Sequence, residues 1–175
     1  MQIFSSSPHG VAPRRAGRTN ELRAPLEGAD LRPSMGLDDD LVPRERAEFE
    51  SLRAAYGASG GLAAGDELAR LLEDGRQGGY AGLARLIVSA EVFGFGWRQA
   101  FWVPMFQFDL ADLTVRPGSK EVLAELVPTY DGWALARWFV EPSAWLDGRR
   151  PLDLLPTDRP SVLEAARADR FVATC

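Results

Sequence analysis

The chain has 175 residues, of which 46% are hydrophobic and 26% charged, and its formal net charge is −5. This length suits one sizeable domain with an appended segment, and the acidic balance provides no global positive field that would hold a nucleic acid. The single cysteine, Cys175, has no partner within the chain, which excludes an internal disulfide framework and a cysteine zinc site. This cysteine usage fits a reducing cytoplasm, where we expect the protein to reside. Since no apolar run is long enough to span a bilayer, we expect no membrane partner.

Residues 1–42 are rich in proline, glycine and arginine and poor in aromatic side chains. Such a segment cannot bury enough apolar area to offset the entropy of ordering, so we expect a disordered leader. It contains the one histidine of the chain, His9, which argues against a buried catalytic imidazole. The carboxylates of Asp38–Asp40 are contiguous and converge poorly on a metal ion, so we assign no metal site there.

Residues 43–80 carry two helical patterns separated by glycines. The first pattern begins at Pro43, and the second is capped by Asp66 and ends at Gly75. These signals predict a helical hairpin. The alternative is a helix-turn-helix unit, which would make the chain a DNA-binding transcriptional regulator that uses helices in 44–80, although no arginine-rich recognition face follows.

An aromatic segment over residues 92–108 follows a predicted helix over 80–89. Its apolar residues alternate with a period of two in both arms, which predicts a β-hairpin with Pro104 at an edge or a bulge. The apolar face of Phe93–Phe106 is a candidate homodimer surface if it does not close on the chain's own core. The Gly94-x-Gly96 pair lacks the third glycine of a nucleotide-binding loop, and we reject that interpretation.

A further helix is predicted from Ser119, as its N-cap, to the stop at Pro128. It leads into a compact helical module over Asp131–Arg170, in which Pro142 ends an aromatic helix. Gly148 then permits a tight turn, and Pro151 begins the next helix at a position where a missing N–H costs nothing.

The fold class that these patterns predict is mainly α: a small helical domain with one aromatic β-hairpin and a disordered N-terminal leader. We expect three regions, which are the leader over 1–42, the helical hairpin region over 43–80, and a domain over 81–175 that includes the β-hairpin 92–108.

The most specific motif of the chain is the Leu-x-Gly-x-x-Pro-Leu-x-Leu-Leu run at 146–155, followed by Val162–Ala166 and preceded by the aromatic segment Pro104–Asp109. Residues from about 85 to 172 resemble the Xre/MbcA/ParS-like toxin-binding domain family. The resemblance implies a bacterial antitoxin that neutralises an NAD-consuming, RES-type toxin by occluding its active site. Since residues 1–80 show no Xre-type helix-turn-helix, an orphan interaction protein without a toxin is a further alternative.

Neutralisation of this kind requires a contact surface, so we expect no enzymatic activity and no catalytic, cofactor-binding or metal-binding residue. Arginine and tryptophan are common interface anchors. The candidate partner-binding residues are Trp145, Arg149, Arg150, Arg167, Arg170 and Phe171. The residues expected to set the structure of the motif are Trp138, Leu146, Gly148, Pro151, Leu152 and Leu155.

Two further expectations concern the same module. Leu152, Leu154 and Leu155 should provide apolar surface beside the turn. The segment Ala165–Cys175 should enter or cover the cleft of the toxin, so that deletion of Asp169–Cys175 weakens binding and leaves the fold intact.

Overall fold

A computed structural model describes residues 38–75 and 77–175 of the chain, with side chains from residue 43 onward. Most of the expected leader, including His9, lies outside the described residues. The first helix, α1 (Asp38–Tyr56), begins five residues before Pro43, the residue at which the sequence pattern predicted its start.

A three-stranded antiparallel sheet contains the predicted β-hairpin. Strands β2 (Phe95–Trp97) and β3 (Ala100–Pro104) pair across a two-residue turn, in which Arg98 has a positive φ of 53°. The third strand, β1 (Leu62–Ala64), pairs with the other edge of β3. Pro104 therefore ends the central strand, beyond its last pair with β2, where a missing N–H breaks no bond to that strand.

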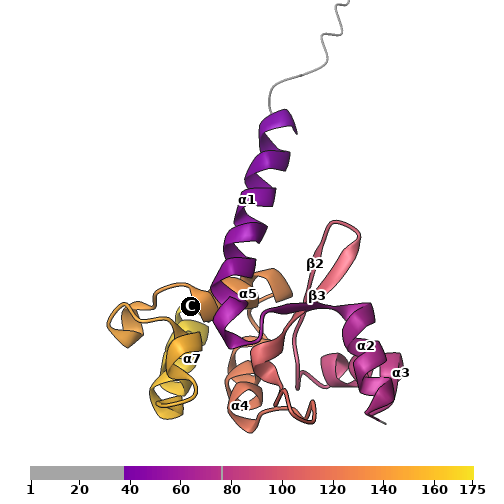
Figure 1. The fold of residues 1–175 in the computed structure, drawn as a ribbon. Coiled ribbons are helices and arrows are strands. Elements are labelled where there is room, and N and C mark those ends of the chain that lie inside the picture. Colours follow the sequence, from indigo (N-terminus) through magenta and orange to yellow (C-terminus); the bar gives the residue numbers. More distant parts are fainter. Residues whose placement is uncertain (1–37, 76) are drawn as a thin grey trace, which may run out of the picture. The chain divides into compact units, whose positions relative to one another are not determined.

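The helical hairpin expected over 43–80 is not formed. Between α1 and α2 (Gly65–Asp74) lie a short 3-10 helix, η1 (Gly57–Ser59), and β1. Helix α2 packs on α3 (Gly79–Val88) instead (Figure 1). Asp66 lies in the first turn of α2 and does not cap it, because the helix begins one residue earlier. Pairing of β1 with β3 involves residues about forty positions away in the chain, which local helical patterns do not reveal.

The C-terminal half is helical, as predicted. After the 3-10 helix η2 (Met105–Gln107) come α4 (Pro117–Leu126), α5 (Gly132–Val140), η3 (Ala144–Leu146), α6 (Pro151–Leu154) and α7 (Arg159–Thr174). Helices α4 and α7 lie side by side (Figure 1). Ser119 is not the N-cap of α4: the helix begins at Pro117, and the Ser119 hydroxyl donates to the Arg116 carbonyl oxygen at 2.8 Å. The predicted class, mainly helical with one aromatic hairpin, is confirmed.

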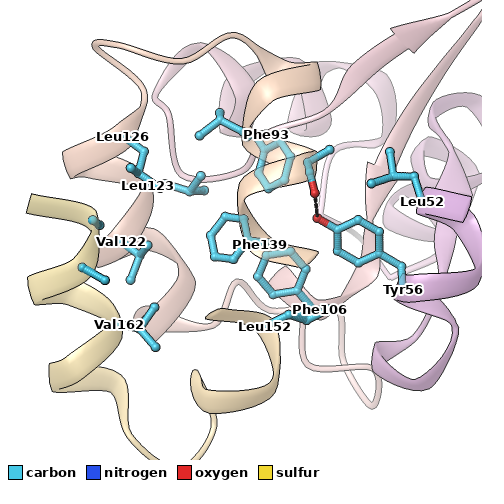
Figure 2. Packing of buried hydrophobic residues seen from close by; sticks show 14 of the residues in the cluster. Leu52, Tyr56, Phe93, Phe106, Val122, Leu123, Leu126, Phe139, Leu152 and Val162 are labelled. Atoms are coloured by element: carbon cyan, nitrogen blue, oxygen red, sulfur yellow. Dashed lines mark hydrogen bonds between the residues drawn. The ribbon is translucent and has the colours of Figure 1, made fainter. Parts of the chain in front are cut away.

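Two hydrophobic clusters each contain residues from both predicted regions, 43–80 and 81–175. In the larger cluster the two regions meet directly. The end of α1 contributes Leu52 and Tyr56, which face the aromatic residues Phe93, Phe106 and Phe139 (Figure 2). The Tyr56 hydroxyl is fully buried and donates to the Ala136 carbonyl oxygen of α5 at 2.8 Å (Figure 2). The described residues therefore form one compact unit.

The buried side chain of Gln107 fixes the hairpin to the segment that precedes it. Its amide oxygen accepts from the Phe93 N–H at 2.8 Å, and its amide nitrogen donates to the carbonyl oxygens of Phe93 and Pro104, each at 2.9 Å. These three hydrogen bonds satisfy both polar atoms of the completely buried Gln107 side chain. This glutamine belongs to the aromatic segment Pro104–Asp109 that the resemblance singled out.

The candidate dimer face of the hairpin is occupied within the chain. Phe93, Phe95 and Phe106 are all buried. Phe49 of α1 stacks on Trp97 with ring centroids 3.8 Å apart, so α1 covers the hairpin.

Within the described residues, no helix combines the length and the apolar character that crossing a bilayer requires.

Candidate functional site

The turn between α5 and α6 has the geometry predicted from Gly148 and Pro151. Asp147 and Gly148 are both left-handed, with φ of 54° and 75°. The Ser143 carbonyl oxygen accepts from the Gly148 N–H at 2.9 Å, and the Ser143 N–H donates to the Arg149 carbonyl oxygen at 3.0 Å. Pro151 stands in the first turn of α6. The turn is thus closed by its own backbone, which makes it a rigid support for the side chains that it carries.

Asp169 of α7 links two tryptophans of this module. It accepts from the indole N–H of Trp138 on α5 at 2.6 Å and from that of Trp145 on η3 at 2.7 Å. Burial is the main cause that raises the pKa of Tyr130, and the negative charge of Asp169 raises it further. One carboxylate therefore fixes the orientation of two large rings from two different elements.

The ring of Trp145 is exposed, as expected, although its indole N–H is hydrogen-bonded to Asp169. Its relative exposure is 56%, and that of Phe171 on α7 is 69%. Arg149 is also exposed: its side chain donates to the Leu146 carbonyl oxygen at 3.2 Å and lies 3.9 Å from the Asp147 carboxylate. Such weak contacts leave the Arg149 guanidinium available to a partner.

The three other candidate partner-binding arginines have partners within the chain. Arg150 forms a two-bond pair with Asp153, at 2.7 and 3.2 Å. Arg167 and Arg170 of α7 both donate to Glu125 of α4, at 3.1 and 2.7 Å. Bonds to Glu125 and then to Glu164 raise the pKa of Arg167. Arg167 and Arg170 therefore join α7 to α4, whereas Arg150, at the N-cap of α6, pairs with a residue of that helix.

Five of the six motif residues that we expected to set the structure lie in or against the core, and the sixth, Gly148, is exposed in the turn. Leu146, Pro151 and Leu152 are buried, and Trp138 and Leu155 pack against the buried cluster. The expectation that Leu152, Leu154 and Leu155 form apolar surface is wrong for the first two, which are 6% and 8% exposed. A four-residue helix between two turns can place its leucines inward, because both ends reverse the chain.

The residue that sequence reasoning missed is Asp169. Asp169 is the first residue of Asp169–Cys175, the segment that we expected to be dispensable for the fold. It accepts hydrogen bonds from both tryptophans, and its neighbour Arg170 pairs with Glu125. Deletion of Asp169–Cys175 would therefore disturb the module as well as any contact surface. The available signal was two tryptophans in one short module, each with an indole N–H that requires an acceptor when it is packed.

Convergent titratable groups are not found in the described part of the chain. No group of three or more histidine, cysteine, aspartate or glutamate residues is placed to hold a metal ion among residues 43–75 and 77–175. The carboxylates that show a pKa shift have hydrogen bonds near the surface: a bond from Lys120 lowers the pKa of Glu91, and bonds from Thr114 lower that of Asp112.

Comparisons with protein-family models, with curated proteins and with solved structures find no match to this chain. Its function is therefore inferred from the residues and their geometry.

Proposed function

We propose that the chain is an antitoxin-like, protein-binding module that neutralises an NAD-consuming, RES-type toxin by covering its active site. The observation that carries the proposal is the exposed ring of Trp145, held in one orientation by the 2.7 Å bond to Asp169. An exposed tryptophan with a fixed orientation loses little conformational entropy when it enters a pocket of a partner, which is the property of an interface anchor.

The surroundings of Trp145 favour contact with a protein. Arg149 lies four residues away on the same closed turn and offers a planar donor fork to carboxylates or carbonyl oxygens. Val172, at 62% exposure, follows Asp169 by three residues on α7, so it adds apolar area on the face of the helix that holds Trp145. Phe171, at 69% exposure, extends the apolar area at the end of the helix. The RES-type identity of the partner comes from the resemblance of the Leu146–Leu155 motif. Occlusion requires no chemistry from the antitoxin itself.

The test is co-expression of the chain with the RES-type enzyme from the same genome, with cellular NAD as the readout. Wild type should preserve NAD, and Trp145→Ala and Arg149→Ala should each lose most of that protection. The matched control is Tyr80→Ala on α3, an aromatic residue of similar exposure, 61%, which should protect like wild type. Equal melting temperatures would show that all variants fold. Depletion of NAD to the same level with and without the wild-type chain would contradict the proposal.

The alternative of a DNA-binding regulator gains no support from the described helices. Helix α2, in the region that it would use, carries Asp66, Glu67, Glu73 and Asp74 against one arginine, Arg70. This negative charge repels a phosphate backbone.

A further inference from the structure

A second feature lies away from Trp145, where the end of α1, the loop before α4, and α6 surround a cavity of about 630 Å³. We call it the arginine cleft, because Arg116, Arg150 and Arg159 line it together with the apolar side chains of Phe106, Phe108 and Leu152. Its volume lies within the range of about 300–1,000 Å³ that is usual for small-molecule sites.

The wall and the rim of the cleft differ in chemistry. Phe106, Phe108 and Leu152 are 6%, 0% and 6% exposed, so the apolar part belongs to the rigid core. The guanidinium groups of Arg150 and Arg159 belong to side chains that are 42% and 50% exposed. A ligand that suits both parts has an apolar body and a charged end.

The charge balance decides which charged end fits. Arg150 is paired with Asp153 at 2.7 Å, and Arg159 lies 3.5 Å from Glu121. Among the described residues, Arg116 has no ion-pair partner. Three guanidinium groups against two carboxylates leave one positive charge, which matches a monoanion and not a phosphate dianion.

The start of α4 brings this charge close to the backbone. Gly118 and Ser119, in the first turn of α4, line the same cleft. A β-carbon on Gly118 would lie 3.2 Å from the Arg159 δ-carbon. Because glycine has no side chain, the aliphatic part of Arg159 can pack closely against the first turn of α4 at this position. The positive end of the helix dipole adds to the unpaired Arg116.

We infer that the arginine cleft binds a small amphipathic carboxylic acid, with the carboxylate at Arg116 and the alkyl or aryl body against Phe106, Phe108 and Leu152. This site goes beyond the proposed toxin contact, since it shares no residue with Trp145, Arg149 or Phe171.

The experiment is an NMR titration of the full-length ¹⁵N-labelled chain with octanoate, with 1-octanol as its uncharged match and with acetate and inorganic phosphate as anions without an apolar body. Octanoate should bind saturably and shift the amide signals of Gly118 and Ser119. Octanol should bind about tenfold more weakly, the difference expected for loss of one charged hydrogen bond.

Arg116→Gln should weaken octanoate binding about tenfold and leave octanol binding unchanged, because Arg116 is exposed and is not needed for the core. Arg85→Gln, an exposed arginine of α3 outside the cleft, should bind octanoate like wild type. The inference is overturned by the absence of saturable octanoate binding, by octanol binding as tightly as octanoate, by phosphate binding more tightly than either, or by an Arg116→Gln variant that binds octanoate unchanged.

Discussion

Gly132, the first residue of α5, packs directly on the backbone of Gly94 before the hairpin. A β-carbon at Gly132 would overlap the Gly94 carbonyl oxygen and would lie 3.2 Å from the Phe95 α-carbon. A β-carbon at Gly94 would in turn meet the ring of Phe101. The first glycine of the Gly94-x-Gly96 pair, which resembles a fragment of a nucleotide loop, is thus explained by the ring of Phe101, which leaves no room for a side chain at position 94.

Gly132→Ala should destabilise the protein by about 1–3 kcal/mol, since α5 or the hairpin must shift to admit the methyl group. Gly96→Ala is the matched control: no atom lies within 4 Å of its β-carbon position, so its effect should be small or slightly stabilising. Urea denaturation of both variants measures the difference. Equal stabilities would show that α5 and the hairpin do not approach this closely.

Gln107→Met should cost about 3 kcal/mol, because a side chain of similar length replaces three buried hydrogen bonds and leaves the Phe93 amide groups unsatisfied. Gln99→Met, in the exposed hairpin turn, is the control and should change the free energy of unfolding by less than about 0.5 kcal/mol. Chemical denaturation with matched slopes checks both values. A small loss at Gln107 would mean that water satisfies these groups.

Tyr56→Phe should cost about 1–2 kcal/mol at pH 7, because it removes the buried hydrogen bond to the Ala136 carbonyl oxygen. Burial raises the pKa of Tyr56 well above its usual value of 10.0. The folded state therefore holds this proton after the unfolded state has lost it. The stabilisation that protonated Tyr56 gives to the folded state is complete below about pH 10 and decreases as the pH rises toward the folded-state pKa.

The stability difference between wild type and Tyr56→Phe should therefore shrink above about pH 10, because the variant lacks this ionisation. Urea denaturation at a series of pH values from 7 to 11 measures it. The other tyrosines are common to both proteins and cancel in the comparison. A difference that stays constant over this range would contradict a buried phenol at position 56.

Asp169→Ala should release both indoles and cost about 2 kcal/mol, since a charged acceptor serves two donors, at 2.6 and 2.7 Å. Asp169→Asn keeps one acceptor oxygen and should lose about half as much. The anisotropy of tryptophan fluorescence should be lower in Asp169→Ala than in wild type, and the decrease should be smaller in a Trp145→Phe background, which separates Trp145 from the other four tryptophans. Unchanged anisotropy would mean that packing alone orients the ring.

The surroundings of Trp145 show which contacts local sequence patterns can predict. Two features were readable from sequence: an exposed tryptophan beside a turn fixed by Gly148 and Pro151, and an arginine at position 149 close to it. The sequence did not reveal the acceptor that orients the ring, because Asp169 is 24 residues further along the chain and no local rule pairs an aspartate with a distant indole.

The sequence by itself determined the helical class, the aromatic hairpin and the helix ends at Gly75, Pro142 and Pro151, because capping, turn formation and alternation are local properties of the chain. Only the tertiary structure decided that β1 joins the hairpin, that α1 covers its aromatic face, and that Arg167 and Arg170 pair with Glu125. It also decided that the apolar floor of the arginine cleft meets three separate arginines. Each of these relationships joins residues far apart in the chain, and packing of the whole domain selects the partner.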